Sequence, residues 1–119
     1  MSDVSAPDLT APPTEAERIR ARKRFDGLCQ RGTAFLGTEY AILGGAMSWG
    51  SERHLVSAIS NAGGFGVIAC GAMQPERLAE EIAATRALTD RPFGVNLITM
   101  HPQLNELVEV CLQAGVGHI

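Results

Sequence analysis

The chain has 119 residues, enough for one small domain with a hydrophobic core. Hydrophobic residues make up 45% and charged residues 19%, which is typical of a globular protein, and the net charge of −3 gives no general attraction to nucleic acid or an anionic membrane. No apolar stretch approaches the roughly 18 residues that cross a bilayer.

The three cysteines lie far apart and form neither a CxxC pair nor a disulfide framework. They favour buried free thiols in a reducing, cytoplasmic setting, and the N-terminus lacks the apolar core of a secretory signal. We expect residues 1–13, which hold three prolines, to be a disordered leader.

Residues 14–36 are expected to form an N-terminal helix and its connection to the rest of the chain. Thr14 and Glu17 have the spacing of a capping box and predict a charged helix from Thr14 to about Gln30. Its basic run, Arg18 to Arg24, has acidic residues around it. We interpret this run as a solvated helix face rather than a nucleic-acid patch or a transit peptide.

From Tyr40 onward, apolar runs recur at intervals of about 25 residues. They centre near Ile42, Val67, Val95 and Ile119. Helical patterns fill the gaps, and this alternation predicts parallel strands joined by right-handed helical crossovers.

Each helical pattern has its own start, stop and apolar stripe. The three predicted starts are Ser51 as an N-cap, Pro75 and Pro102, and the stops include Gly63 and Gly115. The residues expected to face the core are Leu55, Ile59 and Ala62 in the first helix, Leu78, Ala79, Ile82 and Ala83 in the second, and Leu104, Leu107, Val108, Cys111 and Leu112 in the third.

The rhythm predicts an α/β fold, the N-terminal portion of a (β/α)8 TIM-type barrel. A complete barrel takes about 250 residues. Residues 37–119 are therefore expected to supply three βα units, with Val116–Ile119 starting a fourth strand. The chain would be a fragment of that barrel, whose unpaired last strand favours self-association.

Three strand ends carry residues suited to a ligand, those of the segments Ala41–Trp49, Asn61–Gly71 and Arg91–Ile98. Ala41–Trp49 stops at Gly44, Gly45 and Ala46, where a ligand can lie against bare backbone. Met47 comes directly after this stop, and Met47 and Trp49 could equally be core residues. Asn96 lies in an otherwise apolar strand, where an amide needs a hydrogen-bond partner, either neighbouring backbone or a bound heteroaromatic group.

Other patterns predict little chemistry. Gly64-x-Gly66-x-x-Ala69 matches a dinucleotide fingerprint, but it precedes a strand rather than a helix, so we expect a tight helix-to-strand turn. His54 and His101 favour surface or capping roles, and His118 is expected beside the strand-end pocket without a partner. No metal-ligand spacing links the histidines. Glu80 and Glu81 are expected on a helix exterior.

The segments 39–49, 60–68 and 88–97 together resemble the nitronate monooxygenase family, formerly the 2-nitropropane dioxygenases, and the resemblance extends over about 37–119. It implies an FMN-binding TIM-type barrel that oxidises alkyl nitronates with dioxygen: the substrate carbanion gives an electron to FMN, and the reduced flavin reacts with dioxygen. Ala41 stands where the family usually has Pro, and Ala46 where it commonly has Gly.

The same resemblance implies a set of cofactor-binding residues. The segment Gly45, Ala46, Met47 and Ser48 would contact the flavin ring largely through its backbone, with the N–H and C=O of Met47 free to bond the ring edge. Asn96 would bond the flavin, and Ile98 would lie near it. The family's catalytic His and phosphate loops lie in later barrel units, so we assign no catalytic residue and expect this chain alone to be inactive.

Two alternatives remain open at this stage. The flavin-dependent enoyl-[acyl-carrier-protein] reductases share the motifs and take a hydride from a nicotinamide. The chain could also be a non-catalytic fragment that acts as an interaction module. We expect no nucleic-acid partner, no membrane partner and no metal.

Overall fold

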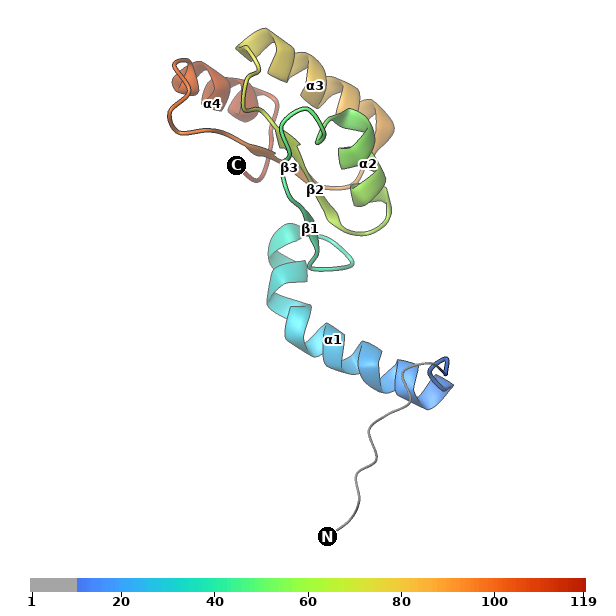
Figure 1. Ribbon diagram of the computed structural model, residues 1–119. Coiled ribbons are helices and arrows are strands. Elements are labelled where there is room, and N and C mark those ends of the chain that lie inside the picture. The colour runs from blue at the N-terminus through green and yellow to red at the C-terminus, as the bar shows by residue number, and fades with distance from the viewer. Residues whose placement is uncertain (1–10) are drawn as a thin grey trace.

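The structure, a computed structural model, describes residues 11–119, so all but the last three residues of the expected leader lie outside the described residues. Within 11–119 the chain runs through the helices and strands α1 (Glu15–Leu36), β1 (Leu43–Gly44), α2 (Arg53–Asn61), β2 (Phe65–Ala69), α3 (Pro75–Leu88), β3 (Phe93–Asn96) and α4 (Leu104–Gln113). Figure 1 shows α2, α3 and α4 gathered around the strands, with α1 extending away from them.

The sheet has the order β1-β2-β3, and both pairs of neighbouring strands are parallel. Leu43 is paired with Phe65, and Gly66 with Phe93. The strand-helix alternation and the α/β fold are therefore confirmed: the chain forms the N-terminal part of a TIM-type barrel. Val116–Ile119 lies beside β3, where the Val95 N–H donates to the His118 carbonyl (3.1 Å), but it is not a regular strand.

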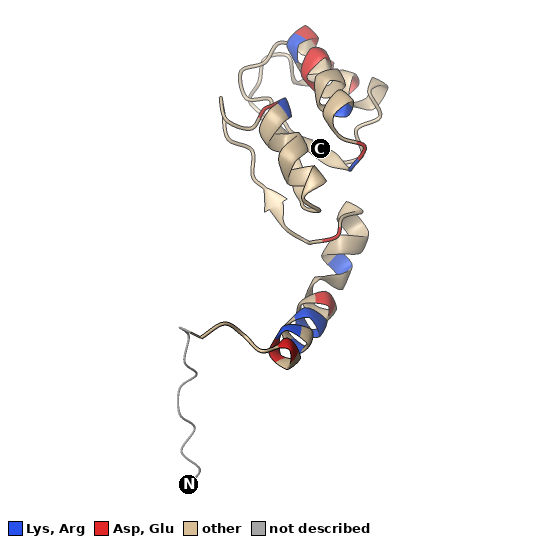
Figure 2. Ribbon diagram, turned by 90° about the vertical axis from the view of Figure 1, so that its right-hand side faces the viewer, with Lys and Arg blue, Asp and Glu red and all other residues tan. Residues whose placement is uncertain are grey.

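Helix α1 begins with the expected capping box. The Thr14 N–H donates to the Glu17 carboxylate (2.8 Å), and the Glu17 N–H donates to the Thr14 hydroxyl (3.3 Å). The helix runs past its expected end near Gln30 to Leu36, where Gly37 adopts a left-handed φ of 69°. Because α1 projects, the molecule measures 64 × 27 × 24 Å. In Figure 2, many of the Lys and Arg positions, coloured blue on the ribbon, lie along this helix.

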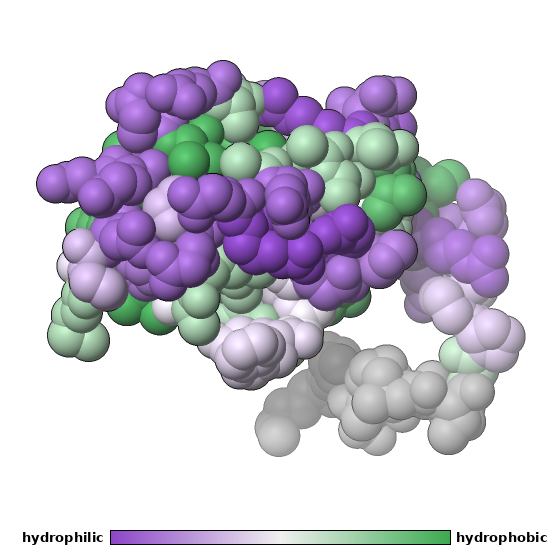
Figure 3. Space-filling view, turned by 90° about the horizontal axis from the view of Figure 1, so that it is seen from above, coloured by the Kyte–Doolittle hydropathy of each residue, from purple (hydrophilic) through white to green (hydrophobic). Residues whose placement is uncertain are grey.

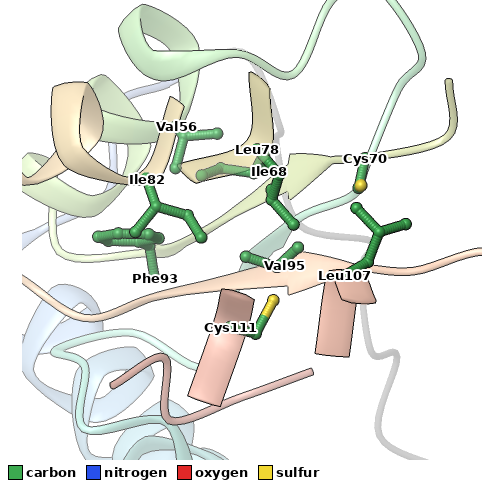
Figure 4. Packing of buried hydrophobic residues seen from close by; sticks show 9 residues of the cluster. All are labelled: Val56, Ile68, Cys70, Leu78, Ile82, Phe93, Val95, Leu107 and Cys111. Carbon is green, nitrogen blue, oxygen red and sulfur yellow. The ribbon is translucent and has the colours of Figure 1, made fainter. Parts of the chain in front are cut away.

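The core lies between the sheet and helices α2, α3 and α4 (Figure 4). Its buried residues are Val56, Ile68, Cys70, Leu78, Ile82, Phe93, Val95, Leu107 and Cys111. Close packing of α2 depends on Gly66, because a Cβ there would meet the Val56 carbonyl oxygen and lie 2.9 Å from the Val56 Cα. Gly63, with φ of 90°, makes the expected helix-to-strand turn.

The predicted stripe of α2 was wrong, whereas those of α3 and α4 were correct in part. Helix α2 buries Val56, Ser57 and Ser60, whereas Leu55 and Ile59 are half-buried and Ala62 is exposed. Gly66 sets which face of α2 packs on the sheet, because the helix approaches this glycine through Val56.

In α3, Leu78 and Ile82 are buried as expected, but Ala79 and Ala83 are exposed. The buried stripe extends to Glu81 and Thr85 instead, because these residues share its helical spacing. In α4, Leu107 and Cys111 are buried, Leu104 and Val108 are half-buried, and Leu112 is exposed.

The sheet face opposite the helices is only partly covered. Leu43 is 57% exposed, whereas Phe65, at the amino end of β2, is buried and packs against His118. Seen from above, polar side chains surround scattered apolar patches (Figure 3). No helix within residues 11–119 is long and apolar enough to cross a membrane.

Candidate functional site

Three loops meet at the carboxyl edge of the sheet, one after each strand. Gly71, just after β2, lies at their junction: a Cβ built on it would be 3.3 Å from the Ser48 hydroxyl and 3.2 Å from the Ile98 Cδ1. The loops after β2 and β3 are also joined by a hydrogen bond from the Cys70 N–H to the Asn96 carbonyl (3.2 Å). Two residues expected in the site, Ser48 and Ile98, therefore lie against one point although 50 residues separate them.

Two further expected residues face open space at this edge. Val95 belongs to the core under the helices, so alternation along β3 places Asn96 on the opposite face. A Cβ at Gly44 would collide with Ile59 of α2, whereas a Cβ at Gly45 would meet nothing within 4 Å. The prediction of a buried Asn96 amide was wrong: its side chain is exposed, because Asn96 is the last residue of its strand.

Ser51 organises the loop after β1. Its hydroxyl accepts from the Met47 N–H (2.9 Å) and donates to the Gly45 carbonyl (3.0 Å). Ser51 is therefore not the predicted helix cap, a role taken by the Glu52 carboxylate, which accepts from the His54 N–H at 3.1 Å.

The same loop corrects the expectation that the Met47 backbone is free. The Met47 N–H is held by Ser51, and its carbonyl accepts from the N–H groups of Gly50 (2.9 Å) and Ser51 (2.8 Å). The loop turns back on itself, so it satisfies both backbone polar groups of Met47 internally. Within residues 11–119, the loop's N–H groups that donate no hydrogen bond include those of Ala46 and Ser48, and a ligand could use them as donors.

Met47 and Trp49 are surface residues rather than core residues. Met47 is 55% exposed and Trp49 is 94% exposed. Trp49 has a φ of 67°, the left-handed region in which an L-residue costs about 1–2 kcal/mol. Such a conformation persists only where its surroundings impose it, and here the flanking turn that closes onto the Met47 carbonyl does so.

A cavity of about 410 Å³ lies beside this loop, between the N-terminal ends of α2 and α3. Its walls come from the loops after β1 and β2 and from the first turns of α3. The lining residues are Ser48, Trp49, Ser51, Glu52, Ala69, Gly71, Ala72, Met73, Gln74, Arg77 and Glu81. Its volume falls in the range of small-molecule sites.

Glu81 forms the charged base of this region, and the expectation of an exterior position for it was wrong. It is fully buried, whereas Glu80 is exposed as expected. Its carboxylate accepts from the Arg53 N–H (2.6 Å), Nε (3.1 Å) and Nη2 (2.7 Å), and from the Arg77 Nη2 at 3.1 Å. Burial raises the pKa of Glu81, but the hydrogen bonds and charge of Arg53 outweigh it, so the pKa is lowered overall.

The sequence contained one signal for this carboxylate. Glu81 lies three residues after Leu78 and four after Arg77, so it shares the buried stripe of α3 and has a cation one turn away. Its main partner, Arg53, lies 28 residues earlier in the chain, and no local pattern predicts that contact.

The histidines lie outside the strand-end cluster. His118, expected beside the pocket, packs between the rings of Phe35 and Phe65, with its Nε2 3.0 Å from the Phe35 carbonyl. Phe65 starts β2, so His118 belongs to the amino half of the sheet. His54 is exposed, and the Nδ1 of His101 accepts from the Gln103 N–H, which is a capping contact. No cluster of candidate metal ligands occurs among residues 11–119.

Comparison with known proteins places the chain among oxidoreductases. A family model described as nitronate monooxygenase matches residues 30–114. The chain is 37% identical over 84 residues to a Mycobacterium tuberculosis protein named (3aS,4S,5R,7aS)-5-hydroxy-7a-methyl-1-oxo-octahydro-1H-indene-4-carboxyl-CoA dehydrogenase, a match that covers 71% of the chain and 24% of that protein. It is 38% identical over 77 residues to a "Probable nitronate monooxygenase" of Staphylococcus saprophyticus, covering 65% and 22%.

A solved structure agrees with these matches. FabK from Thermotoga maritima superposes with a TM-score of 0.71 and 44% identity, over 72% of this chain and 28% of that chain. The chain thus spans about a quarter of the length of the relatives it matches.

Proposed function

The chain belongs to the nitronate monooxygenase family, and we propose that it forms part of an FMN-dependent enzyme that oxidises alkyl nitronates with dioxygen. One observation carries this proposal: the ends of three parallel strands meet around Gly71, with Ser48 and Ile98 against the same point. Ligands of barrel enzymes bind at this edge of the sheet.

The residues at this edge fit a flat ring such as FMN. Gly45 and Ala46 project no side chain beyond Cβ, and the space in front of Gly45 is open. The free N–H groups of Ala46 and Ser48 would donate to acceptor atoms at the ring edge, while Asn96 offers both a donor and an acceptor. Met47 would cover the ring with its exposed side chain rather than with its backbone.

When bound, FMN supplies the electron transfer from the nitronate carbanion to dioxygen, which no side chain of this edge can supply. The chain's own residues bind and orient. Ser51 keeps the loop of Gly45–Ser48 in one conformation through its two hydrogen bonds. The exposed apolar side chains of Met47 and Ile98 would exclude water from the ring.

A second candidate is a flavin-dependent enoyl-[acyl-carrier-protein] reductase. The identity of 44% to FabK, against 38% to the staphylococcal nitronate monooxygenase, favours it. The two candidates differ in their reductant. Oxygen uptake with propyl-2-nitronate supports the first, and NADH or NADPH consumption with an enoyl thioester supports the second.

The first test is FMN binding by the chain itself. We expect FMN titrated with the protein to show saturable quenching of flavin fluorescence. Asn96→Ala should weaken binding about five- to tenfold, the value of one hydrogen bond of about 1 kcal/mol or slightly more. Asn105→Ala, the same change at an exposed position of α4, is the matched control.

Equal FMN affinity of the Asn96→Ala and Asn105→Ala proteins would show that the Asn96 side chain does not contribute to FMN binding. If the parent chain shows no saturable FMN binding, the cofactor proposal fails for this chain.

Cytoplasmic location and self-association are further proposals. The location is supported by three free cysteines, two of them buried. Self-association is supported by the exposed apolar side chain of Leu43 on the uncovered face of the sheet. Light scattering tests the second: a monodisperse monomer would contradict it.

A further inference from the structure

The cavity between α2 and α3 is separate from the surface proposed for FMN. The FMN residues Gly45, Asn96 and Ile98 do not line it, and its walls come entirely from residues 48–81. The two regions share only Ser48 and adjoin Gly71, which also touches Ile98. A molecule in the cavity would therefore reach the strand-end junction without occupying the place of the ring.

The walls of the cavity select for apolar groups. The indole of Trp49, the side chains of Ala69 and Ala72, the bare backbone of Gly71 and the thioether of Met73 supply most of the lining. A thioether adapts its shape to different apolar partners. At roughly 30 Å³ for each water-sized group, a cavity of about 410 Å³ holds about a dozen heavy atoms.

The charges of the cavity select against ions. Its lining carries Glu52, Arg77 and Glu81, a net charge of −1. Glu81 is saturated by Arg53 and Arg77, Arg77 is shared with Glu80, and Glu52 caps α2. An anionic ligand would meet a negative net charge, and a cationic ligand would find its carboxylate already taken. An ion buried without a partner is strongly disfavoured.

Two neutral polar groups are left for a ligand. The Ser48 hydroxyl and the Gln74 side chain make no hydrogen bond within residues 11–119, and Gln74 is an N-cap residue whose side chain does not cap α3. A hydroxyl and an amide N–H are suited to donate to a carbonyl oxygen.

Trp49 supports the same conclusion from a different observation. It is 94% exposed, so its indole is open to contact with a ligand. A ligand in the cavity would cover one face of the indole. Trp49 is also the one tryptophan of the sequence, so its fluorescence reports on this cavity alone.

We propose that this cavity binds the neutral, apolar, carbonyl-bearing tail of the substrate, with the substrate's reactive end at Gly71. The assignment of the occupant as substrate rests on the proposed function, whereas the chemical class of the occupant rests on the cavity itself. Among nitronates, the enzyme would accordingly prefer one with a bulky alkyl or alicyclic tail to one with a small or ionised tail.

The test uses two probes that differ in charge. The full chain is titrated, without FMN, with methyl cyclohexanecarboxylate and with cyclohexanecarboxylate, and Trp49 emission is recorded. We expect a saturable blue shift with the ester and an affinity for the carboxylate lower by about tenfold or more. Equal binding of both probes, or tighter binding of the carboxylate, would overturn the neutral class.

Matched variants test whether the ester probe binds in this cavity. Ala72→Phe, at an exposed position of the cavity wall, should lower the ester affinity by about tenfold or more, whereas Ala87→Phe, on the exposed side of α3 away from the cavity, should leave it unchanged. Ala72→Leu repeats the experiment with a smaller side chain, and circular dichroism checks that each variant is folded. Unchanged ester binding in both Ala72 variants, or no saturable binding by the parent chain, would overturn the proposal.

FMN titrations keep the two proposals apart. Ala72→Phe should bind FMN as the parent does, because Ala72 is outside the FMN surface. Ester binding without any FMN binding would sink the proposed function and leave the cavity's ligand class standing. FMN binding without ester binding would overturn the proposed ligand class of the cavity and leave the proposed function standing.

Discussion

Replacing Glu81 by Gln tests whether a buried ion pair fixes the two helices that border the cavity. Glutamine has nearly the same shape, so the change removes the charge and one acceptor oxygen but leaves no hole. In the parent, one carboxylate oxygen accepts from the Arg53 N–H and Nε, and the other accepts from the Arg53 Nη2 and the Arg77 Nη2. The glutamine NH2 would face these last two donors with no acceptor.

The expected cost follows from this count. Two hydrogen bonds to a charged group are lost, each worth about 1.5–3 kcal/mol, and two cations lose their counter-charge. Breaking a buried pair from one side costs about 3–5 kcal/mol. Because a domain of this size is stable by only about 5–15 kcal/mol, Glu81→Gln should lose a large part of the free energy of unfolding.

Urea unfolding followed by circular dichroism at 222 nm measures the effect. Trp49 fluorescence would be a poor probe, because this side chain is 94% exposed in the folded state. Glu80→Gln is the matched control, since the neighbouring carboxylate is on the surface and its ion pair with Arg77 is worth little. If the two variants unfold within 1 kcal/mol of each other, where a difference of about 3 kcal/mol is expected, the reasoning about Glu81 is refuted.

Three further predictions concern pH, packing and thiols. The folded-state pKa of Glu81 is lowered from 4.5, so the stability that its carboxylate contributes is present above pH 4.5 and is lost as the pH falls through the folded-state pKa. Acid titration should therefore bring the unfolding free energies of the parent and Glu81→Gln together. A constant difference between the two down to full protonation would contradict this. Gly66→Ala should destabilise by about 1–3 kcal/mol through its clash with α2, whereas Gly27→Ala, in open space on α1, should stabilise by about 0.5–1 kcal/mol, both checked by thermal unfolding. Burial raises the pKa of Cys70 to about 11 and also raises the pKa of Cys111, so at pH 8 only about a thousandth of Cys70 is thiolate. A thiol reagent should therefore label the half-buried Cys29 before the two buried cysteines. Equal labelling rates of the three thiols in the folded protein would show that the core opens.

The parts of the fold that could be predicted are those set by short-range pattern. Thr14 and Glu17 lie one turn apart, and their capping box formed as expected. Leu78 and Ile82 show the helical period, and both are buried. In each case the partners are within four residues of one another, so the sequence contains the whole interaction.

The parts that could not be predicted depend on contacts between distant segments. The stripe of α2 was misjudged because its position is set by Gly66, a glycine of the following strand. Glu81 was misjudged because Arg53 is 28 residues away. His118 was placed at the wrong end of the sheet because its contact with Phe35 brings together residues 83 apart.

The motif after β1 shows how prediction from family resemblance can fix a location and miss a mechanism. Its residues lie at the carboxyl edge, as parallel strands require, but the Met47 backbone proposed to meet the cofactor is bonded to its own loop. The two glycines have different environments: Gly44 leaves room for the Ile59 side chain of α2 to pack against the strand, whereas Gly45 faces open space. A run of small residues therefore does not identify a ligand surface by itself, since part of it serves packing. The N–H groups that the loop leaves without an acceptor, among them those of Ala46 and Ser48, mark the surface more reliably, because the N–H groups of Met47, Gly50 and Ser51 have already found their partners within the loop.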